Sequence, residues 1–270
     1  MTRTSRKASL RHIVVTLNTP GSGRPALDVA VRLAAILGAE LKGIFVEDIN
    51  LIRLAGLPFL REFRPCSLAE EAISTQRMQR ELRMLARHAE GMLEQAAREM
   101  GVSWSFHIWR GHAKAASLAR DFGADILSLG RVSSLVSSRV RAASGQYARQ
   151  PRETVNSICV LLSDSKQGMR AMTTACSLAK DPGARLTVLL PESRGRNKPG
   201  LKKKARAILE LHEQAARFEK LAGTGVQSLT RAAETAGFSI LIAAADHPML
   251  QQASLDECLE ALPCPVLLVR

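Results

Sequence analysis

Residues 12–48 read HIVVTLNTPGSGRPALDVAVRLAAILGAELKGIFVED, and this stretch decides the fold. The apolar run Ile13–Leu17 is typical of a strand that is buried on both faces. Apolar residues at three- and four-residue spacing then predict a helix over residues 27–37, and Gly38 follows where a helix ends in the left-handed conformation. A second apolar run, Leu41–Val46, completes a pattern that predicts a right-handed βαβ unit of a parallel sheet.

The same pattern recurs 145 residues later without a gap. Residues 157–193 read SICVLLSDSKQGMRAMTTACSLAKDPGARLTVLLPES. The identical pairs are Ile13/Ile158, Val15/Val160, Leu17/Leu162, Gly23/Gly168, Ala26/Ala171, Ala30/Ala175, Leu33/Leu178, Ala34/Ala179, Gly38/Gly183, Ala39/Ala184, Leu41/Leu186 and Glu47/Glu192. Most of them are residues that pack inside a strand or a helix, so the match indicates a duplicated unit.

Later segments of the two copies also correspond. The third strands are predicted at Ser103–Trp109 and Phe218–Leu221, and the fourth strands at Ala124–Gly130 and Phe238–Ala244. The copies differ before the third strand. The first has a long helical pattern at residues 68–100, whereas the second has a basic loop at 194–204 and a shorter helix.

The chain is therefore predicted to be an α/β protein with two tandem doubly wound parallel sheets. We expect a first domain at residues 1–156 and a second, shorter one at 157–270. The strand Ile158–Leu162 has two open assignments, because it either closes the first sheet or opens the second. The last strand, Pro265–Val269, follows a helix near residues 250–262.

Composition excludes several classes of protein. With 46% hydrophobic and 23% charged residues, the chain is globular and not disordered. It has no apolar run of about 18 residues that would span a membrane, and no signal-peptide core. The five cysteines are scattered without CxxC spacing, which favours a reduced cytoplasmic protein over a disulfide framework or a zinc site. A net charge of +13 is compatible with phosphate-bearing partners.

Several motifs together resemble the universal stress protein family in its tandem form. They are the repeated strand, helix and strand with Ala30, Leu33, Ala34, Gly38, Ala39 and Leu41, the fourth strand Ala124–Gly130, and the closing Leu-Pro-Cys-Pro-Val-Leu-Leu-Val of Leu262–Val269. The resemblance implies, for each copy, a five-stranded parallel sheet of order 3-2-1-4-5, the fold shared with adenine-nucleotide alpha-hydrolases. It also implies a crevice at the carboxyl ends of strands 1 and 4, where nucleotide-binding members hold ATP.

The resemblance implies a nucleotide site in the first copy. Binding members carry Gly-x2-Gly-x9-Gly-Ser/Thr after strand 4, and this copy keeps the spacing but only one of the three glycines. An asparagine replaces the family's acid after strand 1, and a valine matches the residue that reads the adenine edge. The residues implied for ATP or a related adenine nucleotide are Asn18, Val46, Gly130, Arg131, Ser133, Ala143 and Ser144.

The second copy has no glycine between Ala245 and Ser254, and Pro248 removes a backbone donor, so we predict no phosphate site there. It is expected to pack against the first copy as an intramolecular pseudo-dimer, with pairing of two chains left open. Asp246 and His247 place an acid beside a base, as in some catalytic sites, but no nucleophilic serine or cysteine motif accompanies them. We therefore expect neither an enzyme nor a metal site.

The leading hypothesis is a cytoplasmic stress-response protein of the universal stress type that acts by binding. The alternative is a ligand-free adaptor that regulates a protein or an anionic partner through a basic surface and the apolar segment Leu51–Leu60. Neither nucleic acid nor a membrane is an expected partner. The basic run Arg194–Arg206 is predicted to be a flexible, solvated loop with no base-reading helix beside it.

Overall fold

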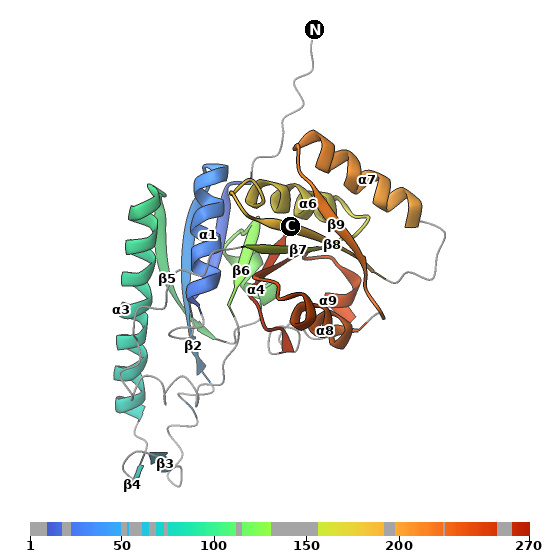
Figure 1. Ribbon diagram of the computed structural model, residues 1–270. Helices are drawn as coiled ribbons and strands as arrows, with labels where there is room; N and C mark the ends of the chain where they lie inside the picture. Colours follow the sequence, from blue (N-terminus) through green and yellow to red (C-terminus); the bar gives the residue numbers. More distant parts are fainter. Residues whose placement is uncertain are drawn as a thin grey trace.

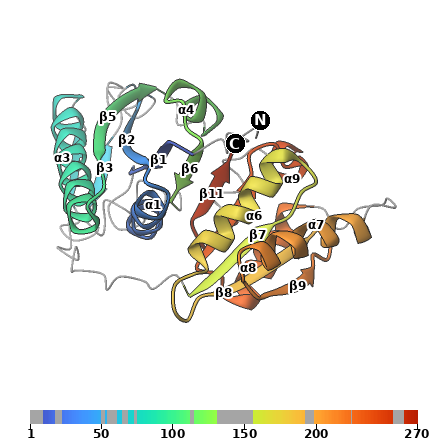
Figure 2. The same cartoon turned by 90° about the horizontal axis from the view of Figure 1, so that it is seen from above.

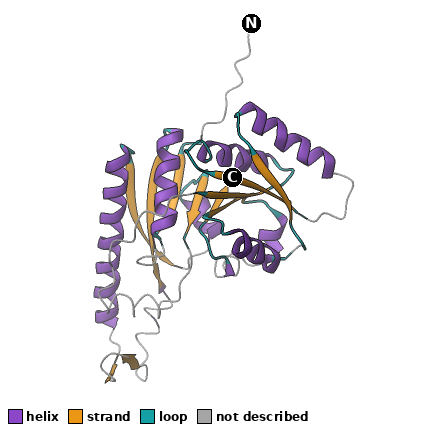
Figure 3. Cartoon of the chain, in the orientation of Figure 1, coloured by secondary structure: helices purple, strands orange, loops and turns teal. Residues whose placement is uncertain are grey.

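The computed structural model is an α/β protein in which helices cover both faces of one long sheet (Figures 1 and 3). It describes residues 10–17, 23–49, 53, 61–64, 69–72, 75–111, 115–130, 156–191, 198–223, 225–252 and 261–270. Among these residues, nine strands form the main sheet, and two more form a separate antiparallel ribbon.

The elements fall into two halves. The first half contains β1 (His12–Thr16), α1 (Arg24–Leu37), β2 (Glu40–Asp48), the ribbon β3 (Arg61–Arg64) and β4 (Ala69–Ala72), α3 (Thr75–Met100), β5 (Trp104–Gly111), α4 (Ala115–Asp121) and β6 (Ile126–Leu129). The second half contains β7 (Ser157–Leu161), α6 (Lys166–Leu178), β8 (Arg185–Leu190), α7 (Lys198–Leu211), β9 (Ala216–Lys220), α8 (Val226–Ala236), β10 (Ile240–Ala244), α9 (Pro248–Gln252) and β11 (Val266–Val269).

The predicted duplication is confirmed in the register of the strands. The sheet order is β5-β2-β1-β6-β11-β10-β7-β8-β9, so each half runs 3-2-1-4 from its outer edge inward. Ile13 lies opposite Leu41 in the first half, and their repeat partners Ile158 and Leu186 lie opposite each other in the second. The strand β7 is thus the first strand of the second half, which resolves the open assignment.

The two predicted parallel sheets are joined edge to edge, so the halves share a single continuous sheet. β6 pairs with β11 in antiparallel register, with Ile126 opposite Val269 and Leu129 opposite Val266. Within the described residues the first half supplies four strands to the sheet, and the last strand of the second half lies in the fifth place. An apolar strand left at an open edge exposes unpaired N–H and C=O groups, and this pairing satisfies them.

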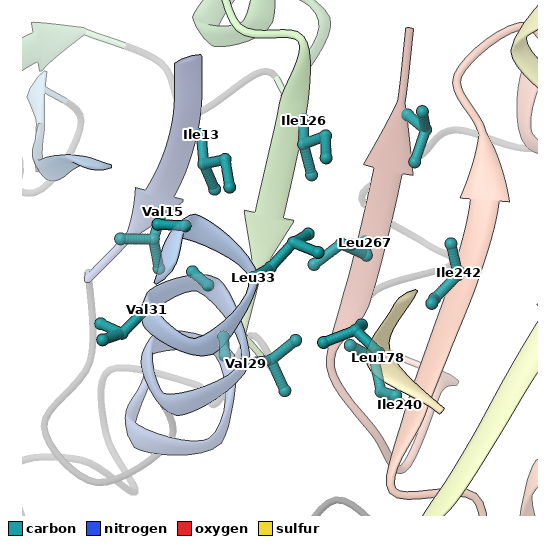
Figure 4. Packing of buried hydrophobic residues seen from close by; sticks show 14 of the residues in the cluster. Ile13, Val15, Val29, Val31, Leu33, Ile126, Leu178, Ile240, Ile242 and Leu267 are labelled. Atoms are coloured by element: carbon teal, nitrogen blue, oxygen red, sulfur yellow. The ribbon is translucent and has the colours of Figure 1, made fainter. Parts of the chain in front are cut away.

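The hydrophobic core continues across the junction. Successive residues of a strand face opposite sides, so Ile13 belongs to the core layer that α1, α3, α6 and α7 cover, whereas Val14 belongs to the layer that α4, α8 and α9 cover. Figure 4 shows side chains of four adjacent strands from both halves on the α1 face: Ile13, Ile126, Leu267 and Ile242. The helices α1 and α6 lie side by side on that face (Figure 2), and Arg32 forms an ion pair with Asp181 between the halves.

The C-terminal residue also joins the halves. The Arg270 backbone N–H donates to the carbonyl oxygen of Asp125 at 2.9 Å, and its guanidinium donates to that of Ala119 at 3.0 Å. Arg170 of α6 in turn donates to the carbonyl oxygen of Arg270 at 2.9 Å. The second half is therefore hydrogen-bonded to the first through both its last strand and its last side chain.

Three helix boundaries differ from the expectations. Gly38 ends α1 with φ 61° as predicted, but α6 already ends at Leu178, so Gly183, with φ 87°, lies in a later turn. α3 begins at Thr75 and not near residue 68, because residues 69–72 pair with β3. The basic run is helical from Lys198 onward, not a loop to residue 204.

Candidate functional site

Each half has one place where a wound sheet changes direction. β1 lies between β2 and β6, and its repeat partner β7 lies between β8 and β10. The helix after β1 packs on one face of the sheet, whereas the helix before β6 packs on the other. Ligands of doubly wound sheets bind at such switch points, at the carboxyl ends of the strands. The two candidate sites are therefore the carboxyl edge of β1 and β6 and that of β7 and β10.

At the first-half edge the structure describes two of the seven predicted site residues. Val46 is buried near the end of β2, and Gly130 directly follows β6. Val15 lies opposite Ser128, so Leu17 and Gly130, two residues further along these parallel strands, reach the same edge. The remaining predicted residues lie outside the described part of the chain: Asn18, Arg131, Ser133, Ala143 and Ser144.

The start of α1 faces this edge and carries no side-chain cap. Its N-cap residue is Gly23, which has no side chain to accept a hydrogen bond from the first turn. The hydroxyl of Ser128 donates to the carbonyl oxygen of Ala26 at 2.9 Å, which anchors the start of α1 to β6. Arg24 and Asp28 form a largely buried ion pair at 3.2 Å in the same turn. The N–H groups of a helix's first turn have no partner within the helix. Pro25 has no N–H, but the other residues of the turn leave this start able to accept an anion.

A buried acid next to Val46 was not predicted as part of the edge. Glu47 is 5% exposed, and its carboxylate accepts a 2.7 Å hydrogen bond from the guanidinium of Arg110, directly opposite on β5. The identity of Glu47 with Glu192 in the repeat was the sequence signal for it. Because its charge is compensated by Arg110, the acid is not a bare negative charge at this edge.

The second-half edge is closed by its own side chains. Ser165 is the N-cap of α6, and its hydroxyl oxygen accepts from the N–H of Gly168 at 2.9 Å. The same hydroxyl donates to a carboxylate oxygen of Asp246 at 2.9 Å and lies 3.1 Å from the hydroxyl of Ser163. The Asp246 N–H donates to the side-chain oxygen of Gln167 at 3.2 Å. An acid of the protein thus lies beside the start of α6, where a ligand phosphate would otherwise bind.

His247 is part of the packing at this edge. It is 2% exposed, its Nδ1 accepts a 3.2 Å hydrogen bond from the N–H of Met249, and it also hydrogen-bonds the backbone of Leu162. Burial lowers its pKa from the ordinary value of 6.5, partly offset by the backbone bond and the nearby charge of Asp246. Since Asp246 bonds Ser165, these residues do not form the hydrogen-bonded relay of a catalytic triad.

The other candidate chemistries find little support in the described residues. No group of three or more His, Cys, Asp or Glu side chains is placed there to hold a metal ion. Cys159, Cys176 and Cys264 are buried and are not joined in disulfides, and burial raises the pKa of Cys176 to about 11. None of the described helices combines the length and the apolar character that crossing a membrane requires.

Comparison with known proteins identifies the fold. No protein-family model matches the chain, and no curated protein matches it in sequence. A universal stress protein structure from Archaeoglobus fulgidus is similar over 96% of both chains, with a TM-score of 0.55 and 12% identity.

Two further similar structures have lower TM-scores. One is a putative universal stress protein from Pseudomonas aeruginosa (0.45, 12% identity, 97% of this chain and 93% of that one). The other is a universal stress protein in complex with cAMP (0.36, 15% identity, 43% of this chain and 96% of that one). The Archaeoglobus structure suffices, because it matches both halves at once: this chain has the fold of a universal stress protein.

Proposed function

We propose that this chain is a cytoplasmic, stress-response member of the universal stress protein family, and that its first half binds an adenine nucleotide such as ATP. The observation that carries the proposal is the uncapped start of α1 at the switch point between β1 and β6. Its repeat counterpart in the second half is capped by Ser165 and lies beside Asp246. We infer that each chain binds one nucleotide.

The chemistry of this edge suits a phosphate. Backbone N–H groups at the start of α1 and after Gly130 would donate to phosphate oxygens, because glycine allows the main chain to approach closely. The amide of Asn18 would hydrogen-bond a ribose hydroxyl, and the buried Val46 would line the adenine side. Arg131 adds a cation that the family motif does not require, which would offset the two lost glycines.

We further propose that the protein acts by binding and not by turnover. Among the described residues, His247 is the one histidine beside an acid at a switch point, and it is buried and held by backbone groups. Its described neighbours lack a hydroxyl that it is positioned to deprotonate, because the Ser165 hydroxyl donates to Asp246. Nucleotide occupancy would then signal to a partner protein.

The test is to denature the purified protein and identify any released nucleotide by mass spectrometry. Calorimetry on the emptied protein should then give one ATP per chain, and millimolar ATP should raise the melting temperature. Ser144→Asp and Arg131→Glu should each abolish this shift by placing a negative charge beside the phosphates.

The matched control is Lys166→Glu, which places a negative charge at the exposed start of the closed site and should leave ATP binding unchanged. Absence of both released nucleotide and a thermal shift would reject the proposal and favour the ligand-free adaptor. Two nucleotides per chain would contradict the closed second site.

A further inference from the structure

Positive charge is concentrated in one small part of the second half. Between residues 194 and 220 there are nine Lys and Arg against three Glu. The sequence led us to expect a flexible loop through residue 204, but α7 begins at Lys198. Lys202, Lys203 and Arg206 are therefore carried on a helix and keep fixed relative positions.

These cations gather around one aromatic ring at the edge of the sheet. Lys202 Nζ lies 5.1 Å and Arg206 Cζ 5.9 Å from the ring centroid of Phe218 in β9. Lys220 follows two residues later on the same strand, so it emerges on the same face of the sheet as Phe218. β9 is the outermost strand of its half. We call Lys202, Lys203, Arg206 and Lys220 the α7–β9 basic surface.

This surface is not neutralised from within. The nearby ion pairs use other cations, namely Lys204 with Asp164 at 2.5 Å and Arg217 with Glu219 at 2.9 Å. None of the four residues of the basic surface forms an ion pair with an acid in the described part of the chain. Their positive charge is therefore available to a partner.

The charge placement in α7 also opposes the stability of the helix. α7 has no acid in its first turn and no basic residue in its last turn, and four of its five cations lie in its N-terminal half. The helix dipole favours the reverse arrangement, by about 0.3–1 kcal/mol for each charge near an end. When charges are placed against the helix dipole without a gain in packing, a functional reason for their placement is expected.

The chemistry of the surface selects one class of partner. The apolar residues Ala205 and Leu209 of α7 are buried in the core, and Leu211 at the end of the helix is its one described large apolar side chain that is exposed. The helix therefore has no broad apolar face for insertion into a membrane. Phe218 lies beneath two cations and is not an exposed anchor of the kind that dominates protein interfaces. The remaining feature of the surface is its set of cations on a helix and a strand, whose charge is complementary to the phosphates of a nucleic acid backbone.

We propose that the α7–β9 basic surface binds the phosphate backbone of a nucleic acid without reading its sequence. This differs from the expectation drawn from the sequence, because that expectation assumed a mobile loop. The proposal does not depend on a nucleotide in the first half. Binding of this kind weakens steeply as salt is added, because each neutralised phosphate releases counterions.

The test is fluorescence anisotropy of the full chain with labelled duplex DNA and single-stranded RNA of mixed sequence, over a series of salt concentrations. The triple variant Lys202→Gln/Lys203→Gln/Arg206→Gln should bind roughly thirtyfold more weakly at low salt. The slope of log K against log salt should become shallower by about 2.7 for the duplex, about 0.9 for each of the three lost contacts. Two duplexes of unrelated sequence should bind equally.

The matched control removes three exposed arginines from another helix, as Arg80→Gln/Arg83→Gln/Arg87→Gln on α3. It lowers the net charge of the protein equally, so it should change binding no more than threefold. Lys202→Arg/Lys203→Arg should keep wild-type affinity, which separates a loss of charge from a loss of folding. Equal weakening by both triple variants would mean nonspecific attraction and would overturn the proposal.

The other partner classes are separate arms of the same experiment. Vesicles containing phosphatidylserine and a polyglutamate peptide are assayed at the same salt concentrations. If the wild-type chain binds either of these but neither nucleic acid, the surface serves a membrane or an acidic protein and the proposal is wrong. Absence of nucleic acid binding at low salt also rejects it.

Discussion

Gly23 and Gly168 occupy the same position in the two repeats, yet they differ in their position relative to the start of the helix. Gly23 is the N-cap of α1, so the first helix begins after it. Gly168 lies three residues inside α6, because that helix begins at Lys166 with Ser165 as its cap. A Cβ at Gly168 would overlap the hydroxyl and carbonyl oxygens of Ser163, so the second helix is pressed against the end of β7.

The comparison teaches that one βαβ frame supports either an open or a closed edge. The strands keep the same register in both halves, so the frame itself is not what differs. An earlier helix start brings Ser165 within reach of Asp246 and satisfies the edge internally. The first half lacks such a cap, and its edge retains donors for a ligand.

The largest expected effects test whether the halves really share one core. Leu33 and Leu178 are identical in the repeat, both nearly fully buried, and both point into the layer shown in Figure 4. Leu33→Ala and Leu178→Ala should each lower the free energy of unfolding by about 3 kcal/mol, because each leaves a cavity. Urea unfolding should show one transition for either variant, since the core is continuous.

Two transitions, with each variant shifting only one of them, would show that the halves unfold independently. The exposed Ile36→Ala is the matched control on α1. It should change the free energy of unfolding by less than about 0.5 kcal/mol, because its side chain is largely in water already.

The next prediction concerns how much stability is lost when each of the two glycines is replaced by alanine. Gly168→Ala should destabilise the protein by about 3 kcal/mol, because the new methyl group collides with backbone and hydroxyl atoms of Ser163. Gly23→Ala should cost less than about 1 kcal/mol, since a poor N-cap loses only part of the capping energy. Equal losses in urea unfolding would mean that the two helix starts are equivalent after all.

The fold was largely predictable because its signal is local and repeated. Buried strands such as Ile13–Leu17 and helices with three- and four-residue spacing can be recognised within one window of sequence. The pairing of β6 with β11 was not predictable, because a short apolar strand can pair with several neighbours, in parallel or antiparallel orientation. Only tertiary contacts, such as those made by Arg270, select that pairing.

The candidate site was predictable only in outline. The family resemblance implies Val46 and Gly130, and both lie at the carboxyl ends of their strands. The hydrogen bond between Ser165 and Asp246 joins residues 81 positions apart, and no sequence motif around either residue predicts the other as its partner. The one local signal was a serine before a helical pattern, which predicts a cap but not its second partner.

The smallest expected effect is a pH dependence of stability that comes from His247 at the second-half edge. Burial lowers the pKa of His247, so the unfolded chain takes up its proton near pH 6.5 while the folded chain does not. Stability should therefore fall as the pH drops below about 6.5, with a slope of at most about 1.4 kcal/mol per pH unit from this group. His247→Asn keeps an acceptor for the N–H of Met249 and should remove that part of the slope.

Hydrogen exchange locates this effect within the molecule. On lowering the pH from about 7 to about 5.5, the protection of amides in β7 and β10 should fall relative to β1 and β6, because protonating His247 opens the closed edge first. The comparison is made with rates corrected for the intrinsic effect of pH on exchange. The His247→Asn variant should lose the difference between the halves. If β1 and β6 lose protection equally in the wild type, the closed edge is no separate unit, and the single sheet transmits the change to both halves.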